Sequence, residues 1–171
     1  EVSAVIPYFG YSRQDRKDRP RVPISASIIS RLIEYAGADR IVTIDIHSEQ
    51  EPGFVEIPWD NLYASYSFLP ELKKHFEKNL IVASPDKGGV PKATFYADLL
   101  DADGIAIVFK ERDVMKKNES QALDMIGDVK DKDVLIVDDM IDTAGTICEA
   151  AKLIHERGAK SVSQRTGSFG V

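Results

Sequence analysis

The chain has 171 residues, of which 43% are hydrophobic and 29% are charged, and its formal net charge at pH 7 is −6. This composition is typical of a globular protein with a sizeable core in one or two small domains. The negative charge argues against broad attraction to nucleic acid. No run approaches the roughly 20 apolar residues of a membrane span. A single cysteine excludes an internal disulfide framework and fits a reducing compartment such as the cytoplasm.

The first elements are a short predicted strand over residues 2–7 and a charged segment behind it. Residues 12–21 hold five basic and two acidic side chains. A run of this kind is either a solvated, internally paired loop or a loop for a nucleotide or polyphosphate, since arginine makes forked hydrogen bonds to phosphate. The residues alone leave both interpretations open.

Apolar residues at helical spacing predict a helix over residues 23–37, and alternation predicts a strand over residues 40–45. In an extended chain Asp45 and His47 point to one face. They could then present an oxygen and an imidazole to one cation or polyphosphate, although a lone histidine is often structural.

A second series of elements follows residue 63. It comprises a helical connector interrupted by Pro70, a strand over residues 80–84, a turn with two glycines over residues 84–89 and a helix over residues 90–100. A strand over residues 104–109 then leads into residues 110–119, where seven of ten residues are charged. This last segment is either an exposed loop or a cationic loop able to close over a triphosphate.

The unbroken apolar run over residues 134–137 predicts a strand buried on both faces, followed by Asp138 and Asp139. Ligands bind at the carboxyl ends of such strands. Residues 142–146 would form a loop into a helix over residues 143–158, whose first N–H groups suit a phosphate, while the carboxylates suit sugar hydroxyls or a metal ion. The pattern predicts a site for a phosphorylated sugar, with two chance surface acids as the alternative. The G-x-x-x-x-G-K-[ST] motif, which a P-loop ATPase would need, is absent from the sequence.

Five segments resemble, in order, those of the ribose-phosphate pyrophosphokinases. The matching stretches are residues 8–17 (their ATP segment), 45–54 (their divalent-cation segment), 84–90, Lys110-x-Arg112 (their flexible catalytic loop) and 138–146, a loop shared with type I phosphoribosyltransferases. The resemblance implies an α/β fold of two similar type I phosphoribosyltransferase-like (Rossmann-like) halves, with mainly parallel sheets flanked by helices. Residues 1–66 would be the C-terminal part of the first half, and residues 67–171 an incomplete second half.

The resemblance also implies a reaction and its participants. The diphosphoryl group of ATP would pass to the anomeric hydroxyl of ribose 5-phosphate, giving 5-phosphoribosyl 1-diphosphate and AMP for nucleotide biosynthesis. Mg²⁺ would be the cofactor, and the protein would be a cytoplasmic homo-oligomer built from dimers, with a hexamer as one form. A non-catalytic regulatory homologue and a type I phosphoribosyltransferase are the alternatives. Phosphoribosyltransferases have no counterpart of the Arg13-Gln14 segment.

The resemblance assigns roles residue by residue. The catalytic residues would be Lys110 and Arg112, the ATP-binding residues Arg13 and Gln14, the metal-associated residues His47 and Asp86, and the ribose-5-phosphate residues Asp138, Asp139, Asp142, Thr143, Ala144, Gly145 and Thr146. Glu56 stands where the family usually has Asp and is given no role. Residues 164–171 depart from the family pattern. We expect a central fragment with poor ATP turnover and a tendency to associate.

Overall fold

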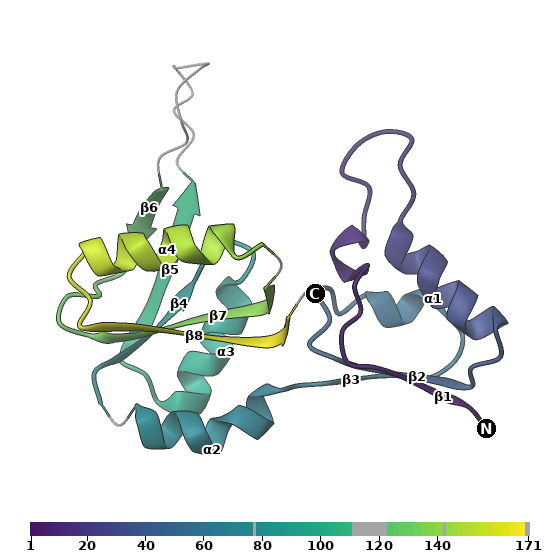
Figure 1. Ribbon diagram of the computed structural model, residues 1–171, viewed down its shortest axis with the longest axis horizontal. Coiled ribbons are helices and arrows are strands. Elements are labelled where there is room, and N and C mark those ends of the chain that lie inside the picture. Colours follow the sequence, from purple (N-terminus) through teal and green to yellow (C-terminus); the bar gives the residue numbers. More distant parts are fainter. Residues whose placement is uncertain (77, 111–122, 142, 170–171) are drawn as a thin grey trace. The chain divides into compact units, whose positions relative to one another are not determined.

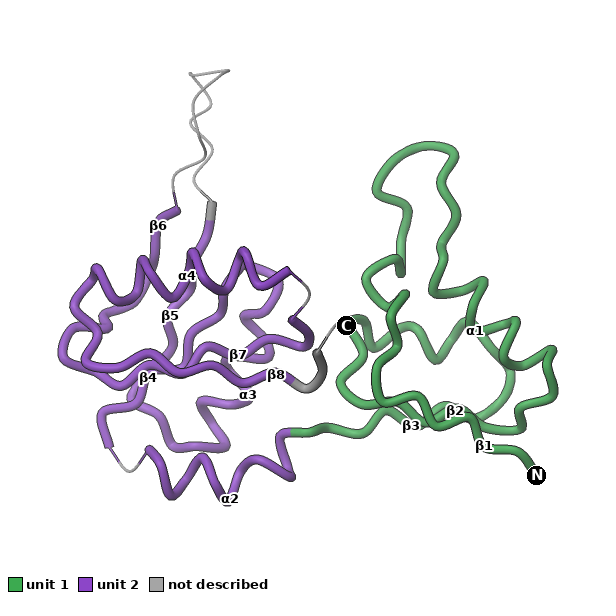
Figure 2. Tube along the Cα trace, in the orientation of Figure 1, with its two compact units in different colours: residues 1–64, 167–171 green, residues 65–166 purple. Residues whose placement is uncertain are grey.

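The computed structural model describes residues 1–76, 78–110, 123–141 and 143–169, without the side chains of residue 110 and residues 167–169. The chain forms two compact units, one of residues 1–64 with residues 167–171 and the other of residues 65–166 (Figure 2). The boundary expected between residues 66 and 67 lies two residues from this division. The fold class agrees with the expectation, since both units combine mainly parallel strands with flanking helices.

Unit 1 is built on a parallel sheet in the order β1-β2-β3 (Figure 1). The strands are β1 (Ser3–Ile6), β2 (Arg40–Ile44) and β3 (Trp59–Leu62), and α1 (Ser25–Tyr35) lies between β1 and β2 in the chain. The short 3₁₀ helices η1 (Ser12–Gln14) and η2 (Glu51–Phe54) lie in the connections. Apolar residues of α1 at spacings of three and four, Ala26, Ile29 and Ile33, pack into a cluster with Phe9 and Ile46.

Unit 2 has a five-stranded sheet in the order β6-β5-β4-β7-β8. Strand β4 pairs in parallel with β5 and with β7, and β6 pairs antiparallel with β5. The strands are β4 (Leu80–Ser84), β5 (Gly104–Lys110), β6 (Leu123–Ile126), β7 (Asp133–Ile141) and β8 (Ser161–Phe169). Its helices are α2 (Ser65–His75), α3 (Val90–Leu100) and α4 (Gly145–Glu156).

Both faces of the unit 2 sheet are covered by helices, with α4 on one face and α2 and α3 on the other (Figure 1). Successive residues of β4 serve opposite faces. Ile81 packs in the cluster that contains Ile154 of α4, while Val82 packs in the cluster that contains Leu72 of α2 and Tyr96 of α3. Because both faces are buried, the central strands are continuous apolar runs rather than alternating ones.

Two predicted boundaries and one predicted interruption are wrong. β7 continues to Ile141 rather than ending at Val137, because Met140, only 3% exposed, extends the buried pattern beyond the acids. α4 begins at Gly145 rather than Thr143. Pro70 lies within α2 and does not interrupt it. The strands β3 and β6 lie in segments where the sequence pattern predicts none.

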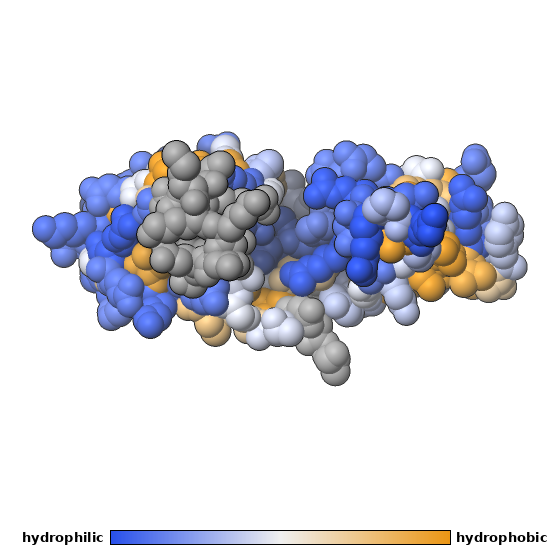
Figure 3. Space-filling model, turned by 90° about the horizontal axis from the view of Figure 1, so that it is seen from above, coloured by the Kyte–Doolittle hydropathy of each residue, from blue (hydrophilic) through white to orange (hydrophobic). Residues whose placement is uncertain are grey.

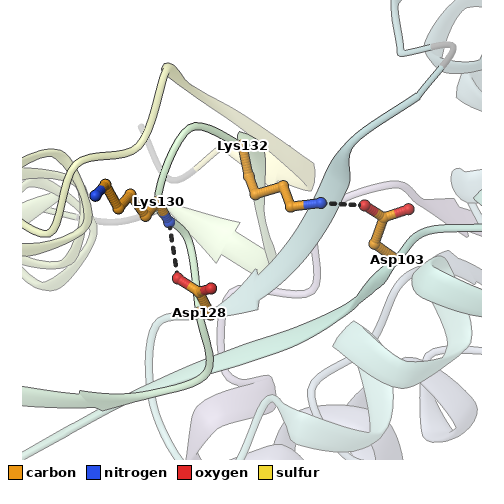
Figure 4. A network of polar contacts seen from close by, with 4 residues as sticks. All are labelled: Asp103, Asp128, Lys130 and Lys132. Atoms are coloured by element: carbon orange, nitrogen blue, oxygen red, sulfur yellow. Dashed lines mark hydrogen bonds and ion pairs between the residues drawn. The ribbon is translucent and has the colours of Figure 1, made fainter.

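The amino ends of β5 and β7 carry paired charges (Figure 4). Lys132, just before β7, places its Nζ 2.5 Å from Oδ2 of Asp103, just before β5. The N–H of Lys130 donates to Oδ1 of Asp128 at 3.1 Å. Partly exposed ion pairs contribute about 1 kcal/mol or less. The Lys132–Asp103 pair therefore links the starts of β7 and β5 only weakly.

Hydrophilic residues cover most of the face drawn in Figure 3, with hydrophobic residues in separate patches between them. The exposed apolar side chains of unit 1 include Ile28, Leu32 and Tyr35 of α1, which are 48%, 56% and 80% exposed. In the part of the chain that the structure describes, no helix has both the length and the apolar character needed to cross a membrane.

Candidate functional site

Three carboxylates lie at the carboxyl ends of two neighbouring strands in unit 2. β4 and β7 are parallel, with Ala83 opposite Ile136. Asp86 follows that register position by three residues on one strand, and Asp138 and Asp139 follow it by two and three on the other. The strand ends thus bring together acids that are more than 50 residues apart in sequence.

The environment of Asp138 shows how closely these acids are grouped. Its pKa is raised from 3.8 to about 7, first by burial, then by the hydrogen bond and charge of Asp139, with a smaller repulsion from Asp86. The N–H of Asp139 donates to Oδ1 of Asp138 at 2.9 Å and opposes this shift. Asp139 is only 9% exposed. Carboxylates are therefore concentrated at a partly desolvated site, which favours a cation or a set of hydroxyl donors as their partner.

The turn that carries Asp86 is fixed from both sides. The Ser84 hydroxyl donates to the Asp86 carbonyl oxygen at 2.6 Å, and the Gly89 N–H donates to Oδ1 of Asp86 at 2.9 Å. A Cβ on Gly89 would lie 2.5 Å from Ser84 Oγ, closer than such atoms approach. Position 89 therefore needs glycine so that the turn can hold the Asp86 carboxylate in place.

The loop before α4 has the geometry of an anion site. Ala144, the residue before the helix, has φ of 60°, in the left-handed region, and its carbonyl oxygen accepts the N–H of Cys148 at 2.9 Å. This conformation explains why the helix begins at Gly145. The first N–H groups of a helix lack partners within it and favour a negative ligand. Thr143, Gly145 and Thr146 are exposed there, whereas Asp142 lies outside the described residues.

In unit 1 the predicted nucleotide residues form one turn. Arg13 and Gln14 belong to η1 and are exposed. Oε1 of Gln14 accepts a hydrogen bond from the hydroxyl of Ser25, the first residue of α1. The η1 turn is thereby tied to the start of the helix that follows it.

His47 lies in the connection after β2, and the extended arrangement predicted for Asp45 and His47 is wrong. Strand β2 ends at Ile44, and Asp45 has φ of 47°, in the left-handed region. The turn that this conformation produces buries Ile46, which is 7% exposed, and leaves the side chain of His47 exposed. Asp45, 8% exposed, is therefore part of the structural turn.

The remaining predicted residues fall at the edge of the described chain. β5 ends at Lys110, of which only the backbone is described, and Arg112 lies outside the described residues.

The two predicted metal residues belong to different units, His47 to unit 1 and Asp86 to unit 2. Within the described ranges no group of three or more His, Cys, Asp or Glu side chains forms a metal cluster.

Two buried polar residues beside His47 are not predicted from the sequence. Ser12 and Glu51 are both 0% exposed, and the Ser12 hydroxyl donates to Oε1 of Glu51. Burial raises the pKa of Glu51 from 4.5 to about 7, and the bonds from Ser12 and Ser48 limit the rise. Both residues stand in polar stretches where exposure is the ordinary expectation, so the pattern holds no signal of this contact.

Comparisons with known families match both units. Residues 67–164 match the model of the phosphoribosyl transferase domain. Residues 1–37 match the model of the N-terminal domain of ribose phosphate pyrophosphokinase. The first match contains Asp86, Asp138 and Asp139 together with the loop before α4, and the second contains η1.

Curated relatives extend the match along nearly the whole chain. The ribose-phosphate pyrophosphokinase of Campylobacter jejuni is 56% identical over 162 residues, and that of Helicobacter hepaticus is 54% identical over 161, each match covering 94% of this chain and 51% of the relative. The chain thus spans about half the length of the curated relatives it matches.

A solved structure gives the same result. The crystal structure of phosphoribosylpyrophosphate synthetase from Mycobacterium smegmatis superposes with a TM-score of 0.90 and 38% identity, over 99% of this chain and 54% of that one. The chain therefore belongs to the phosphoribosyl transferase domain family, and it is similar to ribose-phosphate pyrophosphokinases through both of its units.

Proposed function

We propose that the protein is a ribose-phosphate diphosphokinase, which transfers the diphosphoryl group of ATP to ribose 5-phosphate in nucleotide biosynthesis. The observation that carries this proposal is that one chain joins an N-terminal segment of the pyrophosphokinase type, residues 1–37, to a phosphoribosyl transferase domain. The second domain by itself would equally fit a phosphoribosyltransferase. We further propose that the two family halves divide as residues 1–66 and 67–171.

In this proposal ribose 5-phosphate binds at the carboxyl end of β7. Asp138 and Asp139 accept hydrogen bonds from its ring hydroxyls. Residues 143–146 hold its 5-phosphate through the exposed hydroxyls of two threonines and the first N–H groups of α4. Asp142, assigned to the same group, lies outside the described residues. Hydroxyl donors would relieve the crowding of carboxylates that raises the pKa of Asp138.

Mg²⁺ fits the donors that are present. This ion prefers one or two carboxylates together with waters and substrate phosphates, rather than a cage of protein ligands. Asp86 offers a single oriented carboxylate of this kind, with Oδ1 held by the Gly89 N–H, and His47 is the metal-associated residue proposed for unit 1. When bound, Mg²⁺ would neutralise charge on the phosphate oxygens of ATP.

The reaction is an in-line transfer, in which the attacking and leaving oxygens lie on opposite sides of the β-phosphorus of ATP. The anomeric oxygen of ribose 5-phosphate bonds to the β-phosphorus of ATP, the bond from that phosphorus to the α,β-bridging oxygen breaks, and AMP leaves with the bridging oxygen. The hydroxyl proton is released. Such transfers depend mainly on alignment and charge stabilisation. Arg13 and Gln14 would bind ATP, and Lys110 and Arg112 would stabilise charge on the transferred group.

We also propose that the working protein is a cytoplasmic homo-oligomer built from dimers. The exposed apolar side chains of α1, Leu32 and Tyr35 among them, support association.

An assay of AMP release tests the proposed function. AMP should form from MgATP only when ribose 5-phosphate is present, in a one-to-one ratio with 5-phosphoribosyl 1-diphosphate. A non-catalytic homologue would bind both ligands and release no AMP. A phosphoribosyltransferase would instead consume 5-phosphoribosyl 1-diphosphate when a nucleobase is added.

A further inference from the structure

Glu51 is a buried carboxylate whose partners belong to two separate segments of unit 1. Its side chain is 0% exposed. Oε1 accepts hydrogen bonds from the Ser12 hydroxyl and, at 3.3 Å, from the Ser48 N–H. Among the described residues Oε2 has no hydrogen-bond partner. An acid held in this way is costly, and an apolar side chain would fill the same space at a lower cost.

Ser12 is the junction between these segments. Its hydroxyl donates to Glu51, and its Oγ accepts the N–H of His47 at 2.7 Å. Ser12 is also the first residue of η1, which contains Arg13 and Gln14. One hydroxyl therefore links the η1 turn to residues 35 and 39 positions further along the chain.

We propose that Glu51 is a positioning residue that, through Ser12, couples the η1 turn to the turn that carries His47. This inference rests on the proposed function, in which η1 binds ATP and His47 is associated with the metal. With Glu51 as acceptor, the Ser12 hydroxyl proton is committed, and its oxygen lone pairs face the His47 N–H. The carboxylate thus fixes the orientation of a hydroxyl on which the second turn depends.

Removing the acceptor should disturb a bond that Glu51 does not itself make. In Glu51→Ala the Ser12 hydroxyl loses its acceptor and is free to rotate, so the bond from the His47 N–H weakens. Glu51→Gln keeps an oxygen in the same place and should preserve the arrangement. Unit 2 contains none of these contacts, so the ribose-5-phosphate residues should be unaffected.

Amide hydrogen exchange tests the coupling without any ligand. We expect exchange at the His47 N–H to be about tenfold or more faster in Glu51→Ala and Ser12→Ala, and close to wild type in Glu51→Gln. The matched control is Glu56→Gln, an exposed acid whose side chain has no bond to this network in the described chain. Unchanged exchange at His47 in Glu51→Ala would overturn the proposal.

Calorimetric binding of MgATP and of ribose 5-phosphate tests the functional part. Glu51→Ala should weaken MgATP about tenfold and leave ribose 5-phosphate within twofold, Glu51→Gln should restore MgATP binding, and the double variant with Ser12→Ala should be no worse than either single one. Equal loss of both ligands would mean a general structural defect and would overturn the inference. If the wild-type chain binds no MgATP, the proposed function is contradicted, and the exchange measurement still decides for or against the coupling.

Discussion

The burial of Glu51 predicts that unit 1 loses stability as pH rises through the acidic range. Its pKa is raised from 4.5 to about 7 in the folded chain, so between these values the folded state binds more protons than the unfolded one. The free energy of unfolding must then fall with rising pH in that window and level off above it. One pKa unit corresponds to about 1.4 kcal/mol, so the shift sets an upper bound of about 3.5 kcal/mol on this loss.

The substitution Glu51→Gln isolates this effect because the amide stays neutral at every pH. Compared with wild type, we expect a free energy of unfolding about 1–3 kcal/mol higher at pH 8 and a smaller difference at pH 4.5. Trp59, the single tryptophan, packs edge-on to Phe9 at 5.3 Å between ring centroids, so its fluorescence in urea follows the unfolding of unit 1.

Glu56→Gln is the control, since its exposed side chain should change stability by less than about 0.5 kcal/mol. Parallel stability profiles of wild type and Glu51→Gln between pH 4.5 and pH 8 would contradict a raised pKa of Glu51. A gain in stability of the wild-type chain over that range, relative to the Gln variant, would contradict it equally.

Further predictions concern unit 2. Gly89→Ala should lower the free energy of unfolding, measured in urea, by about 1–3 kcal/mol, because the new Cβ would lie 2.5 Å from Ser84 Oγ. Gly104→Ala is the control, since the atom nearest to its new Cβ lies at 3.8 Å. Equal effects of the two substitutions would contradict the prediction. Asp138→Asn should weaken ribose 5-phosphate about tenfold in calorimetry and leave MgATP unchanged, since a carboxylate acceptor is lost from one site only; retained affinity would remove Asp138 from the site. Chelation of Mg²⁺ should abolish AMP release, and its return should restore it, whereas activity persisting in EDTA would argue against the proposed cofactor.

The sequence was sufficient to predict the elements whose pattern is local. The apolar runs over residues 80–84 and 134–137 correspond to β4 and to the first part of β7, and the helix predicted over residues 90–100 has the bounds of α3. Strands buried on both faces need apolar residues at every position, so a single stretch carries the whole signal. The position of Asp138 and Asp139 at the carboxyl end of a buried strand followed from the general rule for parallel sheets, whereas Asp86 was singled out only through the family resemblance.

Features set by tertiary contacts could not be predicted in this way. Asp45 takes a left-handed conformation that ends β2 early, and a polar residue in a strand pattern gives no warning of it. Ser12 meets Glu51 across 39 residues, and each looks like an ordinary surface residue in its own stretch. The continuation of β7 through two acids depends on burial of Met140, which only the packed sheet reveals.

Phosphorus-31 NMR of the protein with MgATP and ribose 5-phosphate tests the central claim most directly, because it identifies the group that is transferred. We predict that AMP and a sugar-linked diphosphate appear together at equal rates, that neither forms without ribose 5-phosphate, and that no ADP accumulates. Formation of ADP would mean transfer of a single phosphoryl group, and consumption of added 5-phosphoribosyl 1-diphosphate with a nucleobase would mean glycosyl transfer. Either result would contradict the proposed function.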